Sequence, residues 1–134
     1  MSEPDNTDAS AARLEIDRLR SLLSHVPAVI HACRADGRCE TTFVTDSIQD
    51  KMGYAPEQFT SDPSFWVDGI HPDDRARVLD GVSAIADDAS YTHEYRFRHA
   101  DGSYRWIHDE IRVDRAEDGL PVVFVGCWHD ITRY

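Results

Sequence analysis

The feature that most constrains the fold of this chain is a series of alternating polar and apolar residues in its C-terminal third. The series consists of residues 91–99, 103–115 and 120–130, and a period of two is the signature of a half-buried β-strand. Asp101-Gly102 separates the first two segments, and Glu117-Asp118-Gly119 separates the last two. Because short turns that contain glycine join neighbouring antiparallel strands, we expect a three-stranded antiparallel meander.

Two further strands and a helix precede this meander. Residues 28–35 and 39–45 have strand character and are separated by Asp36-Gly37, another hairpin signal. After a stretch rich in glycine, proline and serine, a helix begins at His71-Pro72-Asp73-Asp74, where proline suits the first helical position and carboxylates suit the helix dipole. Its apolar residues share one face: Val78, Val82 and Ile85. Hairpins with helices gathered on one side predict an α+β domain with an antiparallel sheet.

The N-terminal region divides into a leader and a helix. Residues 1–9 are polar and acidic without periodicity, so we expect a flexible leader. Residues 10–26 are predicted to form an amphipathic helix, because apolar side chains recur at spacings of three and four: Ala12, Ile16, Leu19, Leu23 and Val26. A helix of this length is marginal alone in water, so this stripe must pack on its own sheet or on the same helix of a second subunit. Residues 27–134 then form the folded domain.

Length and charge limit the classes of function. A chain of 134 residues is expected to form one domain, and it contains no run of 18 apolar residues that would predict a transmembrane helix. Its 14 Lys and Arg against 25 Asp and Glu give a net charge of −11, which disfavours binding to nucleic acid or to anionic membranes. The N-terminus lacks a secretory signal and the three cysteines have no paired spacing, so we expect a cytoplasmic protein.

Three motifs in this order resemble those of the PAS sensor-domain family. They are His71-Pro72-Asp73-Asp74-Arg75 at the helix start, the segment 95–106 that ends in Arg105-Trp106, and the segment 124–132 that ends in Asp130-Ile131-Thr132. The resemblance covers residues 25–134 and implies a five-stranded antiparallel sheet in the order 2-1-5-4-3, with a PAC-type meander as its last part, around a small cavity under the helices. It also implies a bacterial signal-transduction module that perceives a small ligand, light, redox state or gas, or mediates dimerisation. Such a module passes its signal to an output domain, such as a histidine kinase or diguanylate cyclase, in the same chain or in a partner protein.

One face of the expected sheet is aromatic and contains a carboxylate. The candidate ligand-pocket residues on this inner face are Phe43, His93, Tyr95, Phe97, Ile107, Asp109, Ile111, Phe124 and Trp128. An inward carboxylate requires a partner. Asp109, together with His93 and Tyr95, would anchor a small ligand in an apolar pocket. Alternatively, Asp109 pairs internally, for example with Arg105 or a helix amide, and the aromatic residues are ordinary core.

The opposite, outer face of the meander is also partly apolar. It presents Tyr104 and Trp106, and alternation adds Val123, Val125 and Cys127. Exposure of such a patch is unusual for a monomer. We therefore expect residues 10–26 to pack across this face, over Trp106, and to help form a homodimer.

The sequence gives little support to a cofactor or to catalysis. The photochemical branch of the family needs a cysteine after the second strand, and residues 58–66 contain none, so a flavin photocycle is not expected. Haem needs an axial ligand, for which His93 is the inward candidate, and the seven histidines lack metal-site spacings. We expect a non-enzymatic domain. The alternatives are a ligand-free interaction module and a small cone-shaped isomerase or dehydratase that uses Asp109 and His93 as an acid–base pair.

The closing Asp130-Ile131-Thr132 lies where the family that this chain resembles joins its sheet to the output helix. In that family the aspartate commonly pairs with a basic residue near the hairpin, and Arg98 and Arg105 are both candidates. An exposed pair of this kind is worth at most about 1 kcal/mol, which suits a junction that switches.

Overall fold

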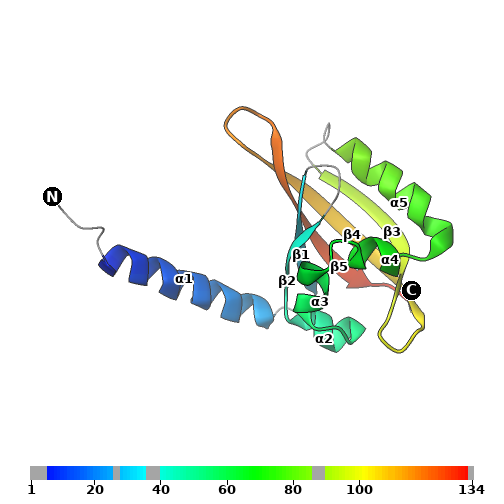
Figure 1. The fold of residues 1–134 in the computed structure, drawn as a ribbon, viewed down its shortest axis with the longest axis horizontal. Helices are drawn as coiled ribbons and strands as arrows, with labels where there is room; N and C mark the ends of the chain where they lie inside the picture. The colour runs from blue at the N-terminus through cyan, green and yellow to red at the C-terminus, as the bar shows by residue number, and fades with distance from the viewer. Residues whose placement is uncertain (1–5, 26–27, 36–39, 86–89, 133–134) are drawn as a thin grey trace.

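The computed structural model describes residues 6–25, 28–35, 40–85 and 90–132. The elements follow in the order α1 (Asn6–Ser24), β1 (Val29–Arg34), β2 (Thr41–Val44), α2 (Ser47–Met52), α3 (Pro56–Ser61), α4 (Phe65–Gly69), α5 (Pro72–Ala84), β3 (Ser90–Arg98), β4 (Tyr104–Arg115) and β5 (Pro121–Asp130). The strands form one sheet, and α2 to α5 lie on one side of it (Figure 1), which confirms the predicted α+β class. Across these ranges no helix is both long and apolar enough to span a bilayer.

The strand order in the sheet is β2-β1-β5-β4-β3, with every neighbouring pair antiparallel. The predicted order is therefore confirmed. The two turns of the meander contain Gly102 at φ 92° and Gly119 at φ 84°. Glycine adopts this left-handed conformation without a steric cost, which explains why the Asp-Gly signals marked these turns. The Asp36-Gly37 signal lies outside the described residues.

Helix α5 begins where the sequence predicted. His71 is its N-cap, and Nδ1 of His71 accepts a hydrogen bond of 3.1 Å from the backbone N–H of Asp73. The carboxylate of Asp74 accepts three hydrogen bonds of 2.9–3.0 Å from Arg96 on β3, one from the backbone and two from the guanidinium. The predicted apolar face is buried: Val78, Val82 and Ile85. Together these contacts hold α5 against β3.

Alternation predicted the two faces of the meander correctly. The helix-facing side chains are all buried: His93, Tyr95, Phe97, Ile107, Asp109, Ile111, Phe124 and Trp128. Phe43 does not belong to this set. It lies opposite Ala32, which in turn lies opposite Val125 on the outer face. Strand β2 is four residues long and its register against β1 shifts after Ala32, so the sequence alone could not assign Phe43 to a face.

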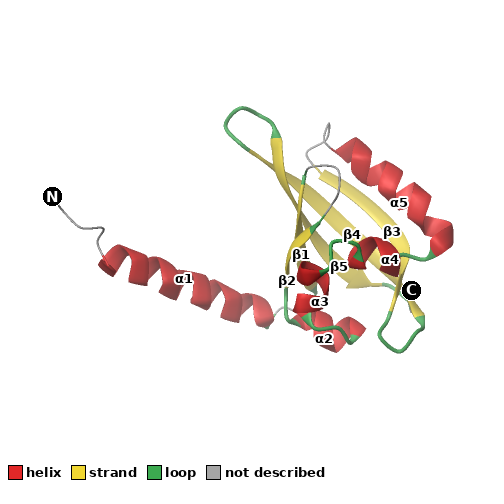
Figure 2. Ribbon diagram, viewed as in Figure 1, coloured by secondary structure: helices red, strands yellow, loops and turns green. Residues whose placement is uncertain are grey.

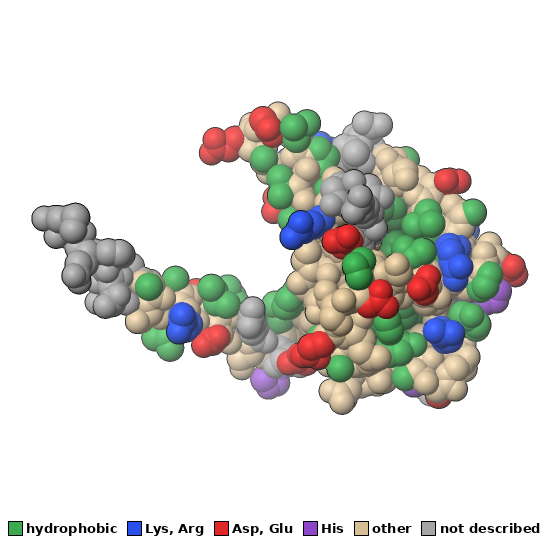
Figure 3. Space-filling model, viewed as in Figure 1, with side chains coloured by type: hydrophobic (Ala, Val, Ile, Leu, Met, Phe, Trp, Pro, Cys, Tyr) green, Lys and Arg blue, Asp and Glu red, His purple; other side chains and the backbone are tan. Residues whose placement is uncertain are grey.

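Helix α1 lies apart from the sheet. It begins at Asn6, within the predicted leader, and projects away from the domain as an arm (Figure 2) with hydrophobic side chains along its surface (Figure 3). Ile16 is 51% exposed, and Trp106 on the outer face is 41% exposed. The expectation that residues 10–26 cover Trp106 of their own sheet is therefore wrong for the single chain, because an apolar patch does not specify which element covers it. Val26 lies outside the described residues.

Candidate functional site

A buried carboxylate lies at the centre of the helix-facing side of the sheet. Asp109 on β4 is fully buried. Its Oδ1 lies 2.9 Å from Nε2 of His31 on β1, and its Oδ2 accepts a hydrogen bond of 3.0 Å from the hydroxyl of Tyr95 on β3. The Tyr95 hydroxyl accepts a hydrogen bond of 3.1 Å from Nε1 of Trp66 on α4. This Asp109 network therefore connects a helix to three strands of the sheet.

His93 lies beside the network on β3. Its Nε2 is 3.5 Å from Oδ2 of Asp109, and its ring centroid is 4.9 Å from that of Tyr95. Among the buried atoms of the described residues, both ring nitrogens of His93 and Nε1 of Trp128 have no hydrogen-bond partner. Each such unsatisfied group costs about 1–3 kcal/mol, so a small rearrangement or an added polar molecule at this point would be stabilising.

Gly126 makes the contact between His31 and Asp109 possible. Strand β5 runs between β1 and β4, and Gly126 lies directly opposite His31. A Cβ atom at position 126 would lie 2.2 Å from Nε2 of His31 and 2.8 Å from Oδ1 of Asp109. The backbone of Gly126 has no positive φ, so the position requires glycine for space rather than for conformation. The network passes over β5 at the one residue without a side chain.

The charges in this network are unusual for a protein interior. Burial by itself would raise the pKa of Asp109, but the hydrogen bond from His31 and the nearby imidazole of His93 outweigh burial and hold the pKa well below its ordinary value. Burial and the nearby charge of Asp109 raise the pKa of Tyr95 well above its ordinary value. The network therefore contains a buried carboxylate, a tyrosine that stays protonated as a donor, and two imidazoles beside the carboxylate.

The interior around the network is nearly filled. Two voids of about 10 Å³ each lie between the helices and the sheet, and both are lined by His31, Thr41 and Trp66. Asp109 also lines the second void. A void of this size has room for about one water molecule. Haem and flavin do not fit this interior as it is folded, although His93, the predicted axial ligand, does point inward.

The structure brings together most of the predicted pocket residues but changes the partner of Asp109. Arg105, one of the two partners considered for an internally paired Asp109, instead lies 3.9 Å from Asp101 in the β3–β4 turn. His31 and Trp66 were missed. The alternation of β1 places His31 on the same face as Val29 and Cys33, which was the available signal for an inward histidine. No sequence signal paired it with Asp109, 78 positions away.

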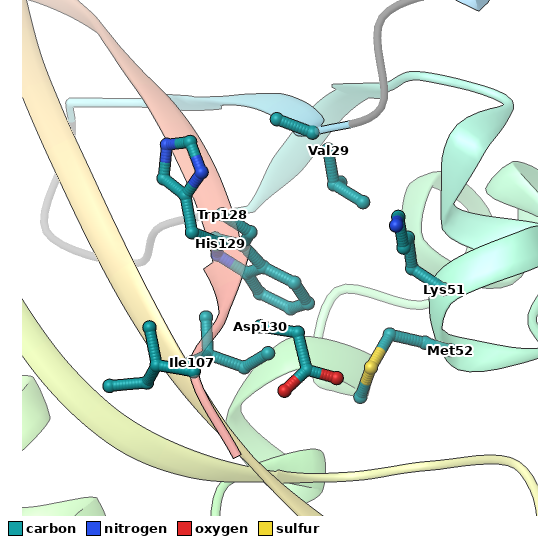
Figure 4. Close-up of a pocket in the computed structure, with 9 residues that line it drawn as sticks. Val29, Lys51, Met52, Ile107, Trp128, His129 and Asp130 are labelled. Carbon is teal, nitrogen blue, oxygen red and sulfur yellow. The ribbon is translucent and has the colours of Figure 1, made fainter. Parts of the chain in front are cut away.

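A groove of about 310 Å³ opens at the end of the sheet where β1 begins and β5 ends. Its apolar lining includes Val29, Met52 and Trp128, and Figure 4 shows Lys51 and Asp130 on opposite sides of it. The groove therefore lies between helix α2 and the predicted output triplet.

Within the part of the chain that the structure describes, the triplet Asp130-Ile131-Thr132 is anchored to the sheet without a basic residue. Oδ1 of Asp130 accepts hydrogen bonds from the backbone N–H and the hydroxyl of Thr132. Oγ1 of Thr132 accepts a bond of 3.0 Å from the backbone N–H of Trp106, and Ile131 donates its N–H to the carbonyl of Trp106. The expected pair of Asp130 with Arg98 or Arg105 is therefore wrong, because a local turn within the triplet satisfies the carboxylate. Trp106 is the residue on β4 to which the triplet is hydrogen-bonded.

Comparison with known proteins agrees with this architecture. Residues 41–127 match the family described as PAS fold. The chain is 29% identical over 119 residues to a methyl sulfide methyltransferase-associated sensor of Methanosarcina acetivorans, and 28% identical over 120 residues to the two-component sensor PprA of Pseudomonas aeruginosa. The N-terminal domain of a diguanylate cyclase with a PAS/PAC sensor from Marinobacter aquaeolei has a TM-score of 0.69 at 22% identity, over 78% of this chain and 95% of that one.

This chain belongs to the PAS family, because the family match covers more than half of its length. Its sensor relatives make it a PAS domain of signal transduction. Each of these two alignments covers 87% of this chain but 12% of the sensor. The alternative of a cone-shaped isomerase or dehydratase is wrong, since the strand order and the family match are those of a PAS fold.

Proposed function

We propose that this PAS domain is the regulatory module of a longer signalling protein and that it works without a bulky cofactor. Its output domain is then of the histidine kinase or diguanylate cyclase type, as in the sensors and the cyclase that it resembles. The observation that carries the proposal is the filled interior, where the Asp109 network leaves two voids of about 10 Å³ each. The module itself regulates rather than catalyses, and we place it in the cytoplasm.

Dimerisation is the second part of the proposal. Two apolar surfaces support it: the stripe of α1, which includes Ile16 and Leu19, and the outer-face patch of Tyr104, Trp106 and Val125, all of them exposed in the single chain. Burying one large apolar side chain contributes roughly 1.5–3 kcal/mol. The patch also contains the residue that anchors the output triplet, since Trp106 bonds both Ile131 and Thr132. A subunit contact there would act directly on the end of the sheet.

A small polar ligand is the second candidate input. It is favoured by the unpartnered nitrogens of His93 and Trp128 beside the Asp109 network. The voids limit such a ligand to the size of one or two water molecules unless the helices move.

Native mass spectrometry and an absorbance spectrum of the chain purified from its own host test both parts. The expected result is a dimer whose mass is twice that of the bare chain, with no visible absorption band. A haem or flavin spectrum, or a bound organic molecule, contradicts the cofactor-free module. A monomeric mass at micromolar concentration contradicts the dimer.

A further inference from the structure

Four side chains with metal-binding chemistry lie together on the outer face of β4 and β5. His108 on β4 lies directly opposite His129 on β5, and Glu110 lies directly opposite Cys127. Residues two apart on a strand share a face, so all four project on the side away from the helices. Figure 4 shows this for His129, whose ring lies on the opposite side of β5 from Trp128. We refer to these four residues as the outer-face cluster.

The distance within each same-strand pair of the cluster matches that between two neighbouring ligands of one metal ion. Nε2 of His108 lies 3.4 Å from Oε1 of Glu110, and Nε2 of His129 lies 3.5 Å from Sγ of Cys127. With bonds of about 2.1 Å to nitrogen or oxygen and about 2.3 Å to sulfur, a tetrahedral zinc site places neighbouring ligand atoms roughly 3.3–3.6 Å apart. Because β4 and β5 are antiparallel, both imidazoles lean in one direction, toward the Glu110–Cys127 pair.

The second ring nitrogen of His108 is already held as in a metal-binding histidine. Its Nδ1 lies 3.2 Å from Oε2 of Glu94 on β3. A carboxylate in this position fixes the tautomer and orientation of a ligating imidazole. With the proton on Nδ1, the lone pair of Nε2 faces the carboxylate of Glu110, so two acceptors oppose each other at 3.4 Å. A metal ion bound to both atoms would remove this opposition.

We propose that the outer-face cluster binds one zinc-type divalent ion through His108, Glu110, Cys127 and His129. Within the described ranges no three such side chains are yet placed to hold a metal ion, so the site closes when the two pairs turn toward each other. His129 and Glu110 are exposed, and exposed side chains change rotamer within nanoseconds. Thiolate, imidazole and carboxylate together favour Zn²⁺ over Mg²⁺ or Ca²⁺.

The site would act on the output end of the sheet. Four protein ligands leave no open position, which is typical of a structural rather than a catalytic ion. The ion would link β4 to β5 at His129, the residue before the Asp130-Ile131-Thr132 triplet. Binding replaces the proton of the Cys127 thiol by the ion, so the ion binds more tightly as pH rises.

Titration of the full chain with Co²⁺ and Zn²⁺ tests the proposal. We expect one ion per chain, a thiolate-to-Co²⁺ charge-transfer band, and a rise of about 5 °C or more in the midpoint of thermal unfolding with excess Zn²⁺. Cys127→Ser should remove the band. His129→Gln should weaken Zn²⁺ binding at least about tenfold, and Glu94→Gln by about 10–100-fold.

His99→Gln is the matched control, because His99 follows β3 next to the β3–β4 turn and pairs with Asp101 at 3.3 Å rather than with the cluster. It should leave affinity unchanged. Far-ultraviolet circular dichroism verifies that each variant is folded. The proposal is overturned by the absence of the charge-transfer band, by equal affinity in Cys127→Ser and the unmodified chain, or by one ion per two chains.

Discussion

At the scale of single residues, the Asp109 network depends on Gly126. A methyl group at this position would approach both His31 and Asp109 to within 3 Å, and both side chains are held by their other contacts. We expect Gly126→Ala to lower the free energy of unfolding by about 3 kcal/mol, the sum of overpacking and a weakened charge-assisted hydrogen bond. Urea unfolding of the two proteins measures the difference.

Gly81→Ala is the control for Gly126→Ala. A Cβ atom at position 81 would also lie 2.2 Å from a neighbour, but that neighbour is the hydroxyl end of the half-buried Tyr91, which can turn away. Alanine also favours helix over glycine by up to about 1 kcal/mol. We therefore expect Gly81→Ala to be neutral or stabilising. Equal losses in the two variants would contradict the role given to Gly126.

Tyr95 is the central link of the network, and its hydroxyl can be removed alone. Tyr95→Phe keeps the ring but leaves Nε1 of Trp66 and Oδ2 of Asp109 without this partner. The expected loss is about 2–3 kcal/mol in the free energy of unfolding, because buried groups left unsatisfied cost their desolvation. Tyr91→Phe, on the same strand, should change stability by less than about 0.5 kcal/mol. A similar loss in both variants would indicate a general effect of the strand.

At the scale of elements, the contact between helix α5 and strand β3 depends on the hydrogen bonds of Asp74 and is sensitive to pH. The hydrogen bonds from Arg96 are the largest influence on the pKa of Asp74 and lower it to about 2. Because this value lies below that of the unfolded chain, the contribution of Asp74 to stability is complete above about pH 4 and is lost as pH falls toward 2. We expect Asp74→Asn to cost about 2 kcal/mol at pH 7.

The pH dependence of this difference provides the check. The difference in unfolding free energy between the unmodified chain and Asp74→Asn should fall to roughly half of its pH 7 value near pH 3, because Asp74 is then partly protonated in the unfolded chain and still ionised in the folded one. Asp73→Asn, one position earlier and 78% exposed at its side chain, should show a much smaller difference. If the difference in unfolding free energy between Asp74→Asn and the unmodified chain does not change with pH, the ionised carboxylate of Asp74 is not the cause of that difference.

The elements also show what the sequence can and cannot predict. Alternation predicted the faces of β3, β4 and β5, because a period of two needs no knowledge of neighbouring strands. Predicting the partner of Asp109 requires knowing which strands are neighbours. His31 contacts Asp109 from two strands away, and only the register of β1 on β5 places Gly126 between these two side chains. The resemblance to the family suggested a salt bridge between Asp130 and an arginine, whereas the carboxylate of Asp130 accepts a hydrogen bond from the hydroxyl of Thr132, two residues later.

At the scale of the whole molecule, α1 and the outer face of the sheet both expose large apolar side chains. The sequence specified an amphipathic helix but not its direction, because a stripe of apolar residues packs equally well on any apolar surface. In the single chain Ile16 and Leu19 of the stripe face solvent, and so does the outer-face patch around Trp106. A second copy of the chain offers both missing surfaces at once.

Removing the arm therefore tests the dimer. Deleting residues 1–26 should yield a monomer by light scattering while the midpoint of thermal unfolding of the remaining domain changes little, since the sheet and α2 to α5 form the core without α1.

Leu19→Lys should weaken the dimer at least tenfold, because a buried stripe position then carries a charge. Leu14→Lys is the matched control: Leu14 is 70% exposed and lies on the opposite side of α1 from the stripe at 100° per residue. If Leu14→Lys and Leu19→Lys dissociate the dimer equally, or if the deleted chain remains dimeric, the stripe is not the subunit contact.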